Sequence, residues 1–547
     1  MEIPNSVVQE IYDCHKANKL YCLDKATALY QLTNTVDSLY IELFVETMRR
    51  MLMGHTQPNI IENNMIKLRH SYRAIIKFIY ECCIEDLFSD NIDDNDLNDW
   101  SKELLDADKF NETRNRIERY LTNKIEARYE PDSKTIEFFK KESKRNYDVD
   151  TYNRWMSRVK PTYYSNQHKE DSLSKKVIAM NKPDILYNMV YSPYLLANNN
   201  SFKQTYKVAH EAILSENDVD NDYEFGGFNL FEYYKVYAYI TALAMNRLNY
   251  YSTSLLLNKI IYGRRNNPSL LLDKKWLIER ISEFCKIDLE IVGKIIDLLI
   301  YNSDFHKDRI AIYQPLFEIN GKICFSSMLV VFSCVQDKLF HLKKKDDNCR
   351  VSFSLMAKEK EVLMTDRIIN YIQNENEEWI IKRNCLLKIN KQSLAEIDIC
   401  IYDKKHKNLL LIELKWFEKL DGENDDYKTD RKLKDTINSR TDKEIIISKN
   451  LKEFIEQNLD SSIEVNQIKS CIISENYSGS VLLEEKLPIL DEYLFFNLCD
   501  KNVYNMAMIF DKLDRRDYYP SFSPFEHFVD EWEYAGYFIK ADRIALN

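Results

Sequence analysis

The segment Leu394–Lys415 constrains the fold more than any other part of this chain. In its first run, Glu396 and Asp398 alternate with isoleucines. A period of two is typical of a strand with one polar and one buried face. Its second run, LLLI at 409–412, is apolar throughout, which is typical of a strand buried on both faces. The polar residues 403–408 predict a connecting turn. The segment therefore predicts two adjacent strands.

The second strand ends in Glu413-Leu414-Lys415. Alternation puts Glu413 and Lys415 on one face, so two adjacent strands can bring Asp398, Glu413 and Lys415 together. Two carboxylates, with water and substrate phosphate completing the shell, are what Mg²⁺ requires. The nearby lysine can orient or deprotonate the attacking water, or neutralise charge on the scissile phosphate. The set predicts phosphodiester hydrolysis, with Asp398 and Glu413 as ligands of Mg²⁺ or Mn²⁺.

The elements around this segment predict an α/β domain with a mixed sheet. They are a helix, a first strand before the two described above, a basic helix and a further strand, at 353–373, 379–389, 427–440 and 468–474. In the first helix, apolar spacing predicts four inward-facing residues: Leu355, Val362, Ile369 and Ile372. We expect the basic helix to end near Arg440, before a separate apolar run at 444–449.

This order of elements, together with Asp398 and Glu413-Leu414-Lys415, resembles the PD-(D/E)XK nuclease superfamily. The resemblance implies a core of helix, three-stranded sheet, helix and strand, with Asp398 as the aspartate and Glu413 and Lys415 as the E-x-K. The proline that usually precedes the aspartate is Ile397 here.

The resemblance also implies auxiliary residues. Family members often add a glutamate from the helix before the sheet, for which we prefer Glu361 to Glu359. They often carry a glutamine or lysine on the helix after the third strand. Here Lys432 is the expected counterpart, with Lys428 and Lys434 as alternatives. Glu396 is expected to be an auxiliary carboxylate.

The rest of the chain predicts a multidomain protein in which a large all-α region precedes the nuclease-like domain. Residues 1–315 have helical apolar spacing, with room for two subdomains divided near 131–150. Residues 316–350 predict a β-hairpin turning at Asn320-Gly321 and a connecting helix. The nuclease-like domain is expected at 351–500, followed by an aromatic-rich C-terminal extension at 501–547.

Two features of the N-terminal region resemble a calcium site and a DNA-binding motif, but in both cases we expect a purely structural role. The acidic runs 90–99 and 218–222 lack the ligand spacing of a calcium loop, so we expect solvated connections. Residues 276–303 predict two helices joined by a short turn. The second of these helices offers Glu290, Lys294 and Asp297 to solvent, a poor surface for phosphates, which favours a helical hairpin over a DNA-binding motif.

Composition limits the possible functions. The net charge of −11 excludes a protein coated in basic surface, although a local basic groove is compatible with it. No phosphate-binding glycine motif of a nucleotide-driven motor occurs, so we expect activation by assembly or a bound signal, with homo-oligomers. No apolar run reaches the roughly 18 residues of a membrane span, and no signal peptide is visible, which predicts a cytoplasmic protein without membrane contact.

Together these patterns predict a metal-dependent endonuclease whose partner is nucleic acid. DNA is favoured because most of the superfamily acts on it, and RNA stays open. The layout resembles bacterial restriction and anti-phage defence effectors. Two alternatives remain: a catalytically silent nucleic-acid-binding protein with a nuclease-like fold, and a helical scaffold whose C-terminal domain mediates self-association.

Overall fold

The computed structural model describes most of the chain. The described residues are 1–52, 68, 71–72, 74–76, 78–83, 100–140, 200–215, 219, 222–256, 270–301, 314–331, 335–343, 347–375, 378–417, 423–475, 477, 479–480, 483, 487–501, 504–519 and 525–546. The acidic run 90–99 lies outside them, and the run 218–222 is described only at Val219 and Asp222.

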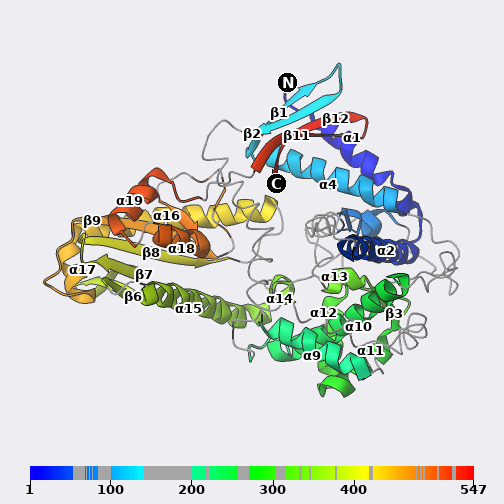
Figure 1. The fold of residues 1–547 in the computed structure, drawn as a ribbon, viewed down its shortest axis with the longest axis horizontal. Helices are drawn as coiled ribbons and strands as arrows, with labels where there is room; N and C mark the ends of the chain where they lie inside the picture. The colour runs from blue at the N-terminus through cyan, green and yellow to red at the C-terminus, as the bar shows by residue number, and fades with distance from the viewer. Residues whose placement is uncertain are drawn as a thin grey trace.

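A five-stranded mixed sheet forms the centre of the C-terminal part (Figure 1). Its order is β10-β9-β8-β7-β6, and its strands are β6 (Trp379–Ile389), β7 (Gln392–Asp403), β8 (Asn408–Trp416), β9 (Gln467–Glu475) and β10 (Ile489–Asp491). The first three strands form an antiparallel meander, whereas β9 and β10 join in parallel. A parallel neighbour requires a crossover connection, which helices provide here. The predicted mixed sheet is confirmed.

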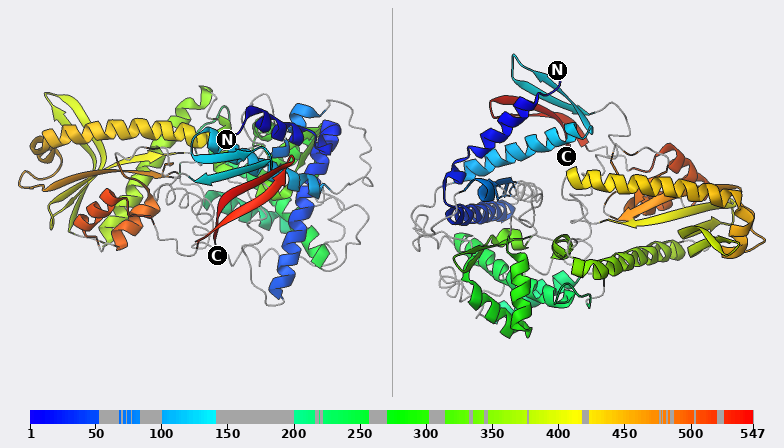
Figure 2. Two further views of the ribbon diagram at one scale, coloured as in Figure 1. Left: turned by 90° about the horizontal axis from the view of Figure 1, so that it is seen from above. Right: turned by 180° about the vertical axis from the view of Figure 1, so that it is seen from behind.

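Helices cover both faces of this sheet (Figures 1 and 2). On one face α15 (Arg350–Glu375), α18 (Glu492–Lys501) and α19 (Met506–Arg515) enclose a core that includes Ile399 and Ile412. On the other face α16 (Glu423–Lys449) and α17 (Leu451–Asn458) pack over the side chains of Cys400 and Leu411. Burial of apolar residues on both faces explains why β8 is apolar along its length.

Two expectations about these helices are wrong. In α15, Leu355 and Val362 are half exposed, although Ile369 and Ile372 are buried. The cause is that only the C-terminal half of α15 lies under the sheet. The run 444–449 is also not a separate element, because α16 continues through it to Lys449. The buried residues Ile437, Arg440 and Ile447 are spaced by three and seven positions, which is a helical pattern of burial.

The N-terminal part is mainly helical (Figure 1). Its described helices are α1 (Asn5–Lys16), η1 (Lys19–Cys22), α2 (Lys25–Leu52), α4 (Ser101–Leu121), α9 (Asn200–Ser215), α10 (Leu230–Leu256), α11 (Lys274–Cys285), α12 (Leu289–Leu299), α13 (Ser327–Val331), α14 (Val335–Lys343) and η3 (Asp347–Cys349). As predicted, α11 and α12 form a helical hairpin, and Lys286 between them adopts a left-handed conformation. The predicted β-hairpin is also present. Asn320 and Gly321 connect β4 (Leu316–Ile319) to β5 (Lys322–Phe325), and both have positive φ.

The expectation of an all-helical N-terminal region is wrong, because this region also contains strands. Strand β3 (Leu270–Asp273) pairs with β5, and β1 (Ile125–Glu130) pairs with β2 (Thr135–Lys140). The C-terminal hairpin of β11 (Phe525–Tyr534) and β12 (Tyr537–Leu546) then joins β2, which gives a mixed sheet of order β1-β2-β12-β11 (Figure 2). The two strands that join, β2 and β12, are far apart in the sequence, so a local sequence pattern cannot indicate their pairing.

A buried carboxylate holds the N-terminal core together. Asp37 of α2 accepts hydrogen bonds from the Ser326 hydroxyl at 2.6 Å and from the backbone N–H groups of Ser327 and Met328 at 2.8 and 3.0 Å. It therefore caps the first turn of α13 from a distant helix. The buried Arg247 lies close enough to interact electrostatically with this carboxylate. No described helix combines the length and apolar character needed to cross a membrane.

We predict that Asp37→Ala destabilises the protein by about 3–5 kcal/mol, because it leaves buried donors and a buried guanidinium without their anion. Urea unfolding followed by circular dichroism measures the change. The control is Asp13→Ala on the exposed face of α1, which should change stability by less than about 0.5 kcal/mol. Equal stability of the two variants would show that the buried carboxylate does not have this role.

Candidate functional site

Asp398 lies where β7 separates from β8 and where its pairing with β6 is interrupted at one position. Along β6 and β7 the pairing passes from Arg383 with Ile399 to Cys385 with Ile397, and Asn384 between them has a φ of 52°. On the other side, pairing with β8 reaches Ile399. The Asp398 carboxylate then accepts a hydrogen bond from the backbone N–H of Leu414 at 2.7 Å. The side chain thus takes the place of a strand carbonyl as the acceptor for this amide.

Glu413 lies between two lysines. Its Oε1 is 3.1 Å from Lys415 Nζ, and its Oε2 is 3.2 Å from Lys443 Nζ. Only 8% of Glu413 is exposed. Burial alone favours the neutral acid, but the two ammonium groups outweigh it and hold the pKa of Glu413 below its ordinary value. Glu413 is therefore a carboxylate at neutral pH, and its orientation is fixed from both sides.

The pKa values of Asp398 and Glu361 are shifted in the opposite direction, above their ordinary values. Burial and the charge of Glu413 raise the pKa of Asp398 to about 6, against the hydrogen bond from Leu414 and the charge of Lys415. Burial also raises the pKa of Glu361, although Lys415 and the backbone N–H of Trp416 oppose this. Two buried carboxyl groups with raised pKa beside an ionised third are a combination that marks a candidate binding or catalytic site.

Lys415 remains a cation in this setting. Burial lowers its pKa, but Glu413, Glu361 and Asp398 together raise it above the ordinary value of a lysine. Because the lysine keeps its proton at neutral pH, it can stabilise negative charge or orient a polar group. It is poorly suited to accept a proton from water.

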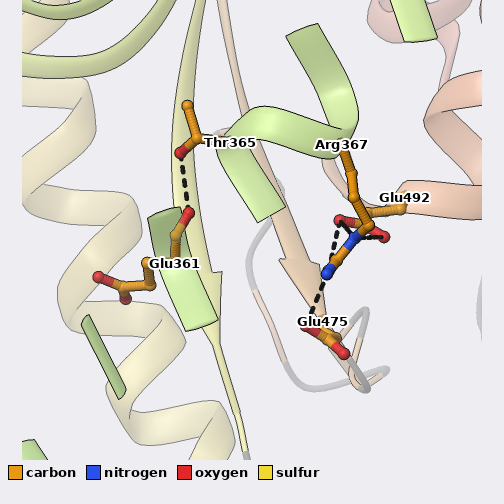
Figure 3. A network of polar contacts seen from close by, with 5 residues as sticks. All are labelled: Glu361, Thr365, Arg367, Glu475 and Glu492. Carbon is orange, nitrogen blue, oxygen red and sulfur yellow. Dashed lines mark hydrogen bonds and ion pairs between the residues drawn. The ribbon is translucent and has the colours of Figure 1, made fainter. Parts of the chain in front are cut away.

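Of the two glutamates considered on α15, only Glu361 is beside these groups. Its carboxylate points away from the network in which Arg367 binds Glu475 and Glu492, at 3.2 and 3.0 Å (Figure 3). Glu359 instead accepts a hydrogen bond from the Tyr223 hydroxyl at 2.6 Å, on the side of the N-terminal part. The phase of the helix thus separates the alternatives that the sequence left open.

The structure does not bring the other two auxiliary residues into this cluster. Glu396 is exposed on β7, and it is not among the groups that shift the pKa of Asp398. Lys432 is exposed on α16, where its backbone carbonyl accepts a hydrogen bond from Thr436. Lys443, eleven positions later on the same helix, provides the cation that contacts Glu413.

Sequence reasoning missed Lys443 because it ended the basic helix near Arg440. The signal that could have found it is a stripe of buried positions along α16, formed by Leu433, Ile437, Arg440 and Ile447. These positions recur at the spacing of one helix face, and Lys443 lies beside them. Arg440, 1% exposed, donates a hydrogen bond to Ser470 at 3.0 Å.

The side chains fit a divalent cation by their chemistry. Among the described residues, no group of three or more His, Cys, Asp or Glu side chains has the arrangement of a formed metal site. However, Asp398, Glu413 and Glu361 interact electrostatically, and burial together with the charge of Glu413 raises the pKa of Asp398 to about 6. Carboxylate oxygens are the preferred ligands of Mg²⁺ and Mn²⁺. A cation there would relieve the repulsion, and Asp398 and Glu413, with Glu361 beside them, would hold it.

Comparison with protein-family models, with curated proteins and with solved structures finds no match to this chain. The basis for a function is therefore the chemistry of its own residues.

We predict that Asp398→Asn stabilises the metal-free protein at about pH 8 by about 1–3 kcal/mol. The folded-state pKa of Asp398 lies above the ordinary value, so the unfolded chain releases this proton first. Stability then falls as the pH rises from about 4 to about 6, and the ionised side chain is a penalty above that range. Thermal unfolding in EDTA at several pH values measures the gain, which should vanish near pH 4.

Glu413→Gln is the control of opposite sign at the same site. The pKa of Glu413 is lowered, so its ionised form stabilises the folded state, and this contribution is lost as the pH falls through the folded-state pKa. The variant should be less stable than the wild type at about pH 8 and should approach it in acid. If both variants changed stability in the same direction, the opposite pKa shifts of Asp398 and Glu413 would be wrong.

Proposed function

We propose that this chain is a metal-dependent endonuclease of the PD-(D/E)XK type, which hydrolyses phosphodiester bonds at Asp398, Glu413 and Lys415. The observation that carries the proposal is the convergence of these groups from two adjacent strands, with Glu361 added from the preceding helix. The order of α15, the β6–β8 meander, α16 and the parallel strand β9 supports a nuclease-like fold for this part.

In the proposed mechanism, Asp398 and Glu413 would hold Mg²⁺ or Mn²⁺, with Glu361 as a further carboxylate. A bound ion would supply Lewis acidity toward the phosphate and toward the attacking water. Lys415, which stays protonated, neutralises the charge that grows on the non-bridging phosphate oxygens. Asp398 must lose its proton to act as a ligand, so metal affinity should fall as the pH drops below about 6.

Lys443 gives Glu413 a partner that does not depend on the substrate. If Lys415 turns toward a phosphate, Glu413 Oε1 loses one ion pair, while Oε2 keeps its contact with Lys443. Glu413 therefore keeps its orientation during the reaction, which preserves the geometry that an ion of strict coordination requires.

DNA is the proposed substrate and RNA the alternative. Exposed cations on β6 and the turn after it lie on the strand beside Asp398, and they include Lys382, Arg383, Lys388 and Lys391. Contacts of this kind with phosphates make binding strongly dependent on salt and independent of sequence. A role in bacterial restriction or anti-phage defence, in the cytoplasm and as a homo-oligomer, belongs to the same proposal.

We predict that Asp398→Asn and Lys415→Ala each reduce cleavage by at least about 10²-fold, because each removes charge that the transition state requires. Purified full-length protein is incubated with plasmid DNA, linear DNA and RNA, with Mg²⁺ or Mn²⁺. The exposed residues Glu396 and Lys432 provide matched controls, and Glu396→Gln and Lys432→Ala should cleave like the wild type.

Two outcomes would oppose this assignment. Equal cleavage by the wild type and both site variants would exclude these residues as the catalytic set. Tight nucleic-acid binding with no cleavage, together with no toxicity or chromosome loss on overexpression in cells, would favour the silent binding protein instead. The measurement in cells is included because purified protein would be inactive if cleavage required a bound signal that only the cell supplies.

We further predict that Lys443→Ala lowers kcat by roughly tenfold and that Lys443→Arg recovers most of the loss. The alanine variant leaves one oxygen of the buried Glu413 without its cation, whereas arginine restores a charge at the same helix position. Steady-state kinetics on a labelled duplex measures both. A wild-type kcat for Lys443→Ala would mean that Lys415 alone orients Glu413.

A further inference from the structure

Helix α15 belongs to two cores at once. Phe353, Met356 and Leu363 in its N-terminal half pack into the core of the N-terminal part. From Met364 onward, its buried side chains, such as Ile368, pack against the five-stranded sheet. Glu361 therefore lies close to the point where the helix passes from one core to the other. Figure 1 shows α15 as one continuous helix that reaches toward α14.

Strand β8 ends at the same junction. Trp416, directly after Lys415, packs against Phe340 of α14 and Phe353 of α15, with ring centroids 6.3 Å away in both cases. Phe340 and Phe353 also contact each other edge to face at 6.2 Å. Phe340 is 1% exposed and belongs to the N-terminal core. The indole thus anchors the end of β8 to that core rather than to the sheet.

Trp416 also touches the site through its backbone. Its backbone N–H lies near the carboxylate of Glu361 and opposes the rise of that group's pKa. Trp416 is bonded covalently to Lys415, so a displacement of the indole shifts both the lysine and the backbone N–H that lies near Glu361. An ion pair between Arg367 and Glu475 also connects α15 to the sheet near Trp416 (Figure 3). Arg367 follows Glu361 on α15, and Glu475 of β9 is the residue that pairs with Trp416 of β8.

We propose that Trp416 is a positioning residue through which the N-terminal part sets the placement of Glu361 relative to Lys415. This inference rests on the proposed function and identifies how the site is regulated. When Phe340 and Phe353 hold the indole, the two charged groups are close and the metal ligands are assembled. A change in the N-terminal core that releases the indole separates them. The Tyr223–Glu359 hydrogen bond connects the N-terminal part to α15 but not to β8. It therefore cannot by itself set the distance between Glu361 and Lys415.

The test compares the loss of two equally buried phenylalanines from the N-terminal core. Phe340 contacts Trp416, whereas Phe110 stacks on His15 near the other end of that core. Mn²⁺ binding to the full-length protein is titrated by electron paramagnetic resonance, without nucleic acid. Phe340→Leu should weaken binding by roughly two- to thirtyfold, the usual range for residues that couple sites, and Phe110→Leu should leave it within about twofold.

Variants of Trp416 keep the proposal testable if Phe340→Leu alters folding. Trp416→Ala should weaken Mn²⁺ binding, and Trp416→Phe should restore it because an aromatic ring is retained. Trp379→Phe, a tryptophan on β6 that packs against Tyr504, should bind like the wild type. Wild-type affinity in Trp416→Ala, or equal losses in Phe340→Leu and Phe110→Leu, would overturn the inference. Mn²⁺ binding that Asp398→Asn leaves unchanged would instead overturn the proposed function, and with it this inference.

Discussion

Glu413 is buried at the end of β8 with one carboxylate oxygen on Lys415 and the other on Lys443, and the rest of the site depends on this arrangement. A carboxylate taken out of water needs partners that compensate for its lost hydration. Its two partners come from β8 itself and from the last third of α16, so α16 must be long enough to reach it. Asp398 and Glu361 then lie beside a carboxylate that stays ionised. Their raised pKa values follow from its charge and from burial.

The same arrangement works against stability. A carboxyl group whose pKa is raised on folding destabilises the native state at neutral pH, because ionising it there is harder than in the unfolded chain. Groups placed at such a cost are characteristic of sites that bind or react rather than of ordinary ion pairs. Asp37 in the N-terminal part gives the contrast. It is also a buried carboxylate, but three donors and a nearby guanidinium satisfy it, and it serves to cap a helix.

The site also lies at a junction between two cores rather than inside one. Helix α15 and the end of β8 each pass from the five-stranded sheet into the N-terminal core, at Leu363 and at Trp416. Rigid packing transmits small displacements because close-packed interiors leave little free volume to absorb them. The N-terminal part packs against Trp416, the residue next to Lys415, and this contact is the physical basis of the proposed control.

Much of the fold could be predicted from local patterns. Alternation in β7, the apolar run of β8, the Asn320-Gly321 turn and the helical hairpin of α11 and α12 all depend on interactions between residues close in sequence. The same patterns predicted that Asp398, Glu413 and Lys415 meet, because alternation fixes which side chains share a face of adjacent strands. These features are properties of the sequence by itself.

The tertiary structure decided what depends on contacts between distant segments. The end of α16, and with it Lys443, is set by the burial of Ile447 against the sheet, and the choice of Glu361 over Glu359 is set by the phase of α15 against β8. Leu355 and Val362 are exposed because the sheet does not extend over them. The joining of β12 to β2 pairs segments that are far apart in the sequence. A local pattern specifies which face of an element is apolar, but only packing specifies what lies against that face. For this reason the sequence predicted Asp398, Glu413 and Lys415, whereas only the tertiary structure identified Lys443.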